Sequence, residues 1–191
     1  MSNDSQSGFL YPRHFLLLAC FTLLLGVMSR LRPSTNLALS FALYGALHAS
    51  ALVLALRVRQ PIWRSGLFIA SAASLSVMTL RVGIFAGQLS EVLPGNIGVY
   101  TVLGFSAVLG AVTYGMLIRL FSLYKLTAGS LAAISIGCMS ASFLALATLS
   151  HIHFLGRWWL AVLWWYAFSG GLWYCDRHAK AVLDIPRAAA P

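Results

Sequence analysis

Acidic residues are nearly absent from this chain. Its 191 residues include four, at Asp4, Glu91, Asp176 and Asp184, and none of them lies inside a long apolar run. Glycoside hydrolysis uses a pair of carboxylates, and Mg²⁺ and Ca²⁺ are bound mainly through carboxylate oxygens. The sequence therefore excludes a two-carboxylate hydrolase and an intramembrane metal–carboxylate site. It also argues against proton or sodium coupling through a carboxylate, unless Glu91 is drawn inward.

Cysteine is scarce as well. Cys20, Cys138 and Cys175 lie in three different apolar segments, and no CxxC motif occurs. An odd, scattered set of this kind forms neither a disulfide framework nor a zinc site. We expect the thiols to act as small buried apolar groups, and we predict no metal and no cofactor.

Charge of either sign is low for a soluble protein. Charged residues make up 9% of the chain, against roughly 25% in soluble domains, and 60% of the residues are hydrophobic. Lysine and arginine outnumber the acids by 13 to 4, and the net charge of +9 would suggest nucleic acid as a partner of a soluble protein. Here the basic residues flank the apolar runs, as membrane topology places them. We therefore expect the lipid bilayer, and not nucleic acid, as the partner.

Six apolar segments are long enough, or nearly so, to cross a bilayer. A spanning helix needs about 20 apolar residues, because about 30 Å of hydrocarbon is covered at about 1.5 Å per residue. Turn signals such as Pro33, Pro61 and the pair Pro94–Gly95 separate the segments. The segments are Phe15–Leu31, Asn36–Leu56, Ile62–Gly87, Asn96–Phe121, Ala128–Ser150 and Trp158–Cys175.

These segments predict an all-α polytopic membrane protein, a six-transmembrane-helix bundle over residues 15–178 with cytoplasmic tails at 1–14 and 179–191. The first segment has the length of a signal-peptide core, but "MSRLRP" after it lacks small residues at cleavage positions, so we expect a retained helix. Most basic residues fall on the side of the membrane that holds the two termini. This bias predicts that both termini lie in the cytoplasm, with the protein in a bacterial inner membrane. With six spans, nine fall on that side, namely Arg13, Arg57, Arg59, Arg64, Arg119, Lys125, Arg177, Lys180 and Arg187, and four on or near the other, namely Arg30, Arg32, Arg81 and Arg157.

A polar stripe interrupts the second segment. Ser40, Tyr44 and His48 are four residues apart and share one helix face, and His48 lies about 18 Å along a path of about 30 Å. Such a stripe should face the bundle interior. It is either a substrate or proton site with a switchable imidazole, or a neutral imidazole hydrogen-bonded to a neighbouring helix. Arg81, near the outer boundary, is a further substrate-binding candidate, although it can also snorkel to the headgroups or pair with Glu91.

Four more candidates lie at the outer face: Glu91, His151, His153 and Arg157. In an extended loop His151 and His153 would point to one side and offer two metal ligands, but no cysteine or carboxylate lies nearby in sequence. The alternatives are a rim that attracts anions, including lipid headgroups, and ordinary loop histidines at the membrane interface.

Two further patterns bear on catalysis and on haem. Ser169, in "FSGGLWY" (168–174), looks like a nucleophile, but counting helical rise separates it from His48 by about 9 Å of depth, so we predict no catalytic residue. By the same count the histidines occupy three depths, which argues against a haem held by two of them. The cytoplasmic edge holds His14 and His178, the midplane His48, and the outer edge His151 and His153.

The fifth segment carries a stripe of small residues at every fourth position: Gly129, Ala133, Gly137, Ala141 and Ala145. Small side chains let helix backbones approach closely, and in lipid this close packing replaces hydrophobic burial as the force that joins helices. We expect the stripe to pack against a neighbouring helix of the same chain. A dimer seam or a moving joint is the alternative.

Without a catalytic constellation, the sequence favours a non-enzymatic integral membrane protein with a polar midplane site around His48. It would be a small transporter or the membrane subunit of a larger complex, acting on an uncharged or anionic small molecule. One alternative is an intramembrane lipid-modifying enzyme, in which the outer arginines and His48 or His151 converge on a headgroup. The other is a haem-binding redox membrane anchor. A homo-oligomer and partner membrane subunits both remain open.

Overall fold

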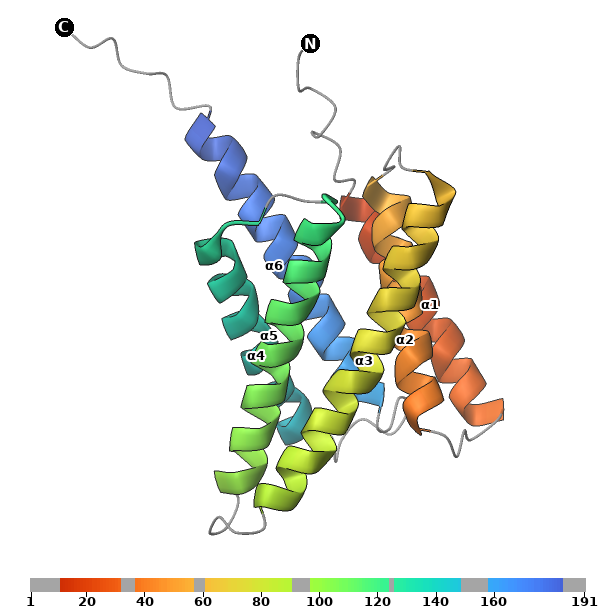
Figure 1. Cartoon of the computed structure of the whole chain (residues 1–191), viewed down its shortest axis with the longest axis vertical. Coiled ribbons are helices and arrows are strands. Elements are labelled where there is room, and N and C mark those ends of the chain that lie inside the picture. The colour runs from red at the N-terminus through yellow and green to blue at the C-terminus, as the bar shows by residue number, and fades with distance from the viewer. Residues whose placement is uncertain are drawn as a thin grey trace, which may run out of the picture.

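The chain folds into helices that run up and down beside one another (Figure 1). The computed structural model describes residues 11–31, 37–56, 61–90, 97–123, 126–148 and 158–183. Each of these ranges holds one helix, and the prediction of an all-helical fold is confirmed. The helices are α1 (Tyr11–Leu31), α2 (Leu37–Leu56), α3 (Ile62–Ser90), α4 (Ile97–Leu120), α5 (Ala128–Thr148) and α6 (Trp158–Leu183).

Each helix overlaps one predicted segment, and the largest differences in length are at α1 and α6. α1 begins at Tyr11 instead of Phe15, and α6 continues to Leu183 instead of ending at Cys175. Both extensions are amphipathic or charged, so hydrophobicity alone does not reveal them. A helix continues past its apolar run when no proline or glycine signal stops it, and none follows Cys175 until Pro186.

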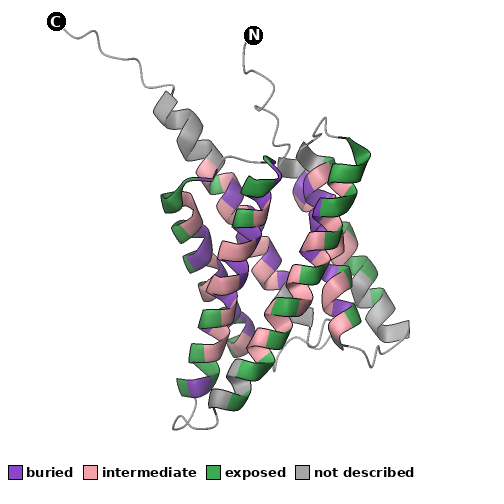
Figure 2. Cartoon of the chain, in the orientation of Figure 1, coloured by how far each residue is buried: buried purple, intermediate pink, exposed green. Residues whose placement is uncertain are grey.

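Among the described residues, three helices are long and apolar enough to cross a membrane: Ile62–Phe85 in α3, Ile97–Leu120 in α4 and Ala128–Thr148 in α5. α1 and α2 contain the shorter apolar stretches His14–Leu24 and Ala38–Leu54. The outer surface of the bundle also carries large apolar side chains, which Figure 2 shows as exposed positions along the helices; examples are Met78, Phe105 and Ile136. Many exposed large apolar side chains of this kind are suited to contact with hydrocarbon.

The helices pack in chain order, and α1 and α6 close the arrangement. α2 contacts α3, α3 contacts α4, α4 contacts α5, and α5 contacts α6, while α1 touches both α2 and α6. α6 runs obliquely through the bundle (Figure 1), and its Phe168 and Leu172 are buried in the core with Tyr114 of α4 and Phe68 of α3. In this position α6 contacts α1, the first helix of the chain, as well as α5, which precedes it.

Two glycines lie at close helix crossings. A Cβ added at Gly45 of α2 would lie 2.6 Å from the backbone oxygen of Ala72 on α3, and one added at Gly171 of α6 would lie 2.7 Å from Cγ1 of Ile134 on α5. The absence of a side chain is therefore what allows the backbones to approach at these two crossings.

The small-residue stripe of α5 does not make such a crossing. Gly129 and Ala133 are exposed, Ala141 is half-buried, and no atom lies within 4 Å of a Cβ added at Gly137. Of the five stripe residues only Ala145 is on the buried face of α5, which comprises Ile134, Ser135, Cys138, Ser142 and Ala145. The first part of the stripe, Gly129 and Ala133, thus faces away from the other described helices, and only Ala145 has the buried position that we expect for the stripe from the sequence. The sequence does not show this because α5 has small residues on more than one face.

Candidate functional site

His48 of α2 lies inside the bundle, with 2% of its surface exposed. Its Nδ1 is 3.1 Å from the Tyr114 hydroxyl oxygen of α4, and its Nε2 is 3.1 Å from Oγ of Ser169 on α6. The ring stacks on the indole of Trp165, with centroids 3.9 Å apart and planes 20° from parallel. Both polar atoms of the imidazole are therefore hydrogen-bonded, and its face is covered.

His14 of α1 joins the same cluster. The side chain is fully buried, and its Nε2 is 2.9 Å from Oγ of Ser169. The His14 and His48 rings lie edge to face with centroids 5.8 Å apart. A single hydroxyl, that of Ser169, thus bonds to an imidazole nitrogen from each of two helices that meet α6.

Two expectations from the sequence are wrong here. Counting helical rise separates His14 and Ser169 from the depth of His48, whereas the structure brings all three within hydrogen-bonding distance. The count assumes parallel helices that begin in one plane, but α1 begins at Tyr11 and α6 runs obliquely. Neither His14 nor Tyr114 is marked by a motif, although "FSGGLWY" does draw attention to Ser169.

The two imidazoles do not fit a haem. An iron held by two histidines needs both nitrogens about 2 Å from the metal, on opposite sides of a flat macrocycle. Here both Nε2 atoms face one hydroxyl, and Ser169 Oγ occupies the position between them that an iron would take. Among the described side chains there is also no group of three histidine, cysteine or acidic residues able to hold a metal ion.

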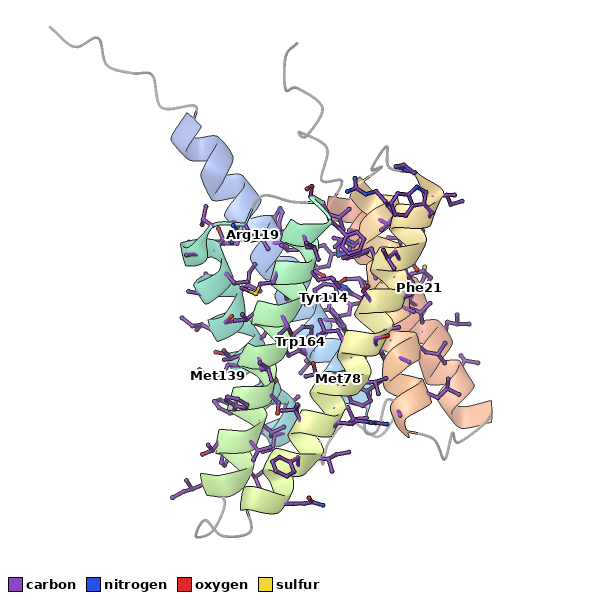
Figure 3. All side chains as sticks on the ribbon, viewed as in Figure 1. Phe21, Met78, Tyr114, Arg119, Met139 and Trp164 are labelled. Atoms are coloured by element: carbon purple, nitrogen blue, oxygen red, sulfur yellow. The ribbon has the colours of Figure 1, made fainter. Side chains whose placement is uncertain are left out.

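A cavity of about 280 Å³ lies beside this cluster. Small residues on the facing sides of α3 and α4, such as Gly83, Ala107 and Gly110, leave the space, and Tyr114 and Trp165 separate it from His48. Tyr114 and Trp164 both point into the middle of the bundle (Figure 3), and the Trp164 indole donates a hydrogen bond to the Ala107 carbonyl oxygen at 3.2 Å. The lining residues are Phe41, Tyr44, Leu75, Ser76, Thr79, Leu80, Gly83, Ile84, Val102, Leu103, Ser106, Ala107, Gly110, Tyr114, Ser142, Trp164 and Trp165.

The polar side-chain groups of the lining residues are hydroxyls and the indole N–H groups of Trp164 and Trp165, and no charged residue is among the lining residues. Ser76 and Thr79 donate their hydrogens to the carbonyl oxygens four residues earlier, both at 2.9 Å. Their oxygen lone pairs remain available as acceptors. Ser106 Oγ is buried and has no hydrogen-bond partner among the described residues. The wall is therefore apolar, neutral and supplied with hydrogen-bond acceptors.

The predicted site residues are distributed as follows. Ser40, Tyr44 and His48 are all buried, and Tyr44 also lines the cavity. Arg81 is exposed on α3 and is not part of the cavity wall, so the structure does not bring it to His48. The predictions for Glu91, His151, His153 and Arg157 lie outside the described side chains.

Comparison with known proteins finds no relative of this chain. No family model, no curated protein and no solved structure matches the chain. A functional conclusion must therefore come from the buried cluster and the cavity.

Proposed function

We propose that this chain is a six-span membrane protein, with both termini in the cytoplasm, that binds a small uncharged molecule in the cavity beside His48. It is a small transporter or the membrane subunit of a larger complex. The single observation that carries this proposal is the cavity of about 280 Å³ with an uncharged, hydroxyl-bearing wall. Its volume is close to the lower end of the range of small-molecule sites, about 300–1,000 Å³.

The wall also indicates the chemistry of the molecule. Burying an ion needs a partner charge, and the charged side chains that the structure describes, Arg64, Arg81 and Arg119, are all exposed. The acceptor oxygens of Ser76 and Thr79 suit a ligand with O–H or N–H groups, and the aromatic rings of Trp164 and Trp165 suit an apolar body. Of the uncharged or anionic small molecule expected from the sequence, these features favour the uncharged one.

A catalytic role for Ser169 fits the structure less well than ligand binding in the cavity, although Ser169 and His48 form a hydrogen-bonded pair. A nucleophile must reach its substrate, but Ser169 is fully buried and is not among the residues that line the cavity. Its hydroxyl is engaged by two imidazoles, and no oxyanion-stabilising donors point toward it among the described hydrogen bonds. These observations favour a binding role over a lipid-modifying enzyme.

Quenching of tryptophan fluorescence in lipid nanodiscs tests the access of uncharged molecules to the cavity. Acrylamide, which is small and uncharged, should quench a fraction of the emission that iodide does not reach. Trp164→Phe should reduce this acrylamide-specific fraction, to which Trp165 also contributes, whereas Trp63→Phe, at an exposed position on α3, should not. An unchanged acrylamide-specific fraction in the Trp164 variant would contradict the proposal.

The topology needs a separate test. Reporter fusions after residues 34, 93 and 154 should be active outside the cytoplasm, and fusions after residues 59, 125 and 190 should be active inside it. Any reversal between these two groups would reject six spans with cytoplasmic termini.

A further inference from the structure

Ser106 of α4 lines the cavity, and its hydroxyl has no partner among the described residues. Its Oγ is buried and makes no hydrogen bond there. The side chain faces Gly83 of α3, where an added Cβ would lie 3.3 Å from Ser106 Oγ and 3.9 Å from Ser106 Cβ. A buried hydroxyl without a partner has lost the hydrogen bonds that it makes to water in the unfolded chain, so its position beside a cavity needs a reason.

Three other hydroxyl side chains on the wall have already given their hydrogens to the backbone. Ser76 and Thr79 donate to carbonyl oxygens of α3, both at 2.9 Å, and Ser142 donates to the Cys138 carbonyl oxygen of α5 at 3.0 Å. These three oxygens can accept a hydrogen bond from a ligand, whereas Ser106 still has its hydrogen to give.

Rotation about one bond brings that hydrogen to the cavity. The Ser106 side chain has staggered positions about its Cα–Cβ bond, and the residue already lines the cavity. No hydrogen bond to a described residue holds Oγ beside Gly83, so none is broken when the side chain turns. Ser106 differs in this respect from Ser142, which would first have to give up its bond to the Cys138 carbonyl oxygen.

The cavity has room for a molecule of about two rings. Its volume of about 280 Å³ is nearly twice that of an apolar cavity of about 150 Å³, which is large enough for benzene. Gly110 of α4 contributes to this room, because a Cβ added to it would lie 3.2 Å from the Trp164 ring and 3.4 Å from the methyl carbon of Thr79. The aromatic and aliphatic side chains of the wall suit hydrocarbon rings.

We propose that the cavity binds an uncharged molecule of about two rings that carries a hydrogen-bond acceptor, such as a ketone oxygen, and that Ser106 recognises this acceptor. The proposal deepens the proposed function, on which it rests for the cavity as a ligand site. The Ser106 hydroxyl donates to the acceptor, and the rings lie against Trp164 and Trp165. A hydrocarbon of the same size fills the same space but leaves the hydroxyl without a partner, so it binds less tightly.

Two probes of nearly equal size separate the hydrogen bond from the packing. The probe α-tetralone has a ketone oxygen where tetralin has a methylene group, and neither has an O–H or N–H group. Binding of each tritiated probe is measured in lipid nanodiscs that contain the protein, and uptake by empty nanodiscs is subtracted. Ser106→Ala should lower the affinity for α-tetralone about 2- to 13-fold, the net effect of one hydrogen bond, and should not lower the affinity for tetralin.

Ser142→Ala is the matched control, because Ser142 also lines the cavity but its hydrogen is bonded to a carbonyl oxygen of its own helix. It should leave the ratio of the two affinities unchanged.

The size of the ligand has its own pair of variants. Gly110→Ala should lower both affinities several-fold, because its methyl group enters the cavity. Gly104→Ala, on the same helix, should lower neither: its Cβ would meet Phe143 at 3.2 Å, and neither of these residues lines the cavity. Circular dichroism and gel filtration of each variant show whether it is folded.

An equal loss of affinity for both probes in Ser106→Ala would show that Ser106 acts through packing alone. An unchanged affinity for α-tetralone would show that the hydroxyl does not reach the ligand. Either result would overturn the proposal, and so would the absence of saturable binding of both probes to the wild type.

Acrylamide access to Trp164 measures the cavity independently. Access without saturable binding, or without the effect of Ser106→Ala, would reject this proposal alone. An acrylamide-specific fraction that is unchanged in Trp164→Phe, together with no saturable binding, would reject the proposed function as well.

Discussion

Replacing Gly45 by alanine should destabilise the bundle, whereas the same replacement at Gly137 should not. The added Cβ at position 45 would lie 2.6 Å from the Ala72 backbone oxygen, and ordinary van der Waals contact begins at 3.4 Å, so α2 and α3 must separate locally by about 0.8 Å. A backbone oxygen cannot rotate away as a flexible side chain can. Overpacking of this kind costs about 1–3 kcal/mol.

The control position separates packing from helix propensity. Alanine is about 1 kcal/mol better than glycine in a helix interior, and this gain applies at both positions. At Gly137 no atom lies within 4 Å of the added Cβ, so only the gain remains. The two variants should therefore differ in free energy of unfolding by about 1–3 kcal/mol, which corresponds to about 5- to 150-fold in the equilibrium constant.

Unfolding in mixed micelles of increasing SDS content, followed by circular dichroism, measures this difference. Gly45→Ala should unfold at a lower SDS fraction than the wild type, and Gly137→Ala at the same or a higher one. Equal stability of the two variants would show that α2 and α3 do not cross at Gly45 as described, and the packing argument would fail.

Three further substitutions are predicted to change stability in the same assay. Ser122 has a positive φ of 54° directly after α4, so Ser122→Gly should relieve left-handed strain and stabilise the protein by about 0.5–1 kcal/mol; a lower unfolding midpoint would contradict this. Ser169→Ala leaves polar atoms of two buried imidazoles without a partner and should cost about 1–3 kcal/mol more than Ser135→Ala, so equal midpoints for the two would argue against the shared hydroxyl. Arg81→Gln should stay within about 0.5 kcal/mol of the wild type because Arg81 is exposed, and a larger loss would indicate a role that its position does not explain.

The fold follows from the sequence to a large extent because apolar runs and turn residues are local signals. Each of the six predicted segments overlaps one helix, and Pro61 directly precedes α3 as expected. The ends are less predictable, since nothing in the composition between Cys175 and Leu183 distinguishes a continued helix from a tail. The buried face of α5 was also beyond sequence reasoning, because small residues occur on several faces and only the neighbouring helices select one.

The buried cluster could be predicted only in part, for a different reason. His48 stands out because it is an ionisable residue in an apolar run, and Tyr44 follows from the four-residue spacing. Ser169, His14 and Tyr114 come from three other helices, and their meeting depends on the oblique course of α6 and the stagger of α1. Helical rise along each segment gives depth only when the tilt and starting plane of every helix are known.

The scarcity of acids and the nature of the cluster are physically related. A buried imidazolium would need a nearby anion. Without one, its transfer from water into an apolar interior would cost on the order of several kcal/mol. The described part of the chain has no carboxylate beside His14 or His48, yet both rings are buried and hydrogen-bonded to hydroxyl groups. Hydroxyls satisfy neutral imidazoles from either side, because each can donate or accept. A cluster built in this way avoids net charge in the bundle interior and keeps both donor orientations available, which a fixed histidine–carboxylate pair would not.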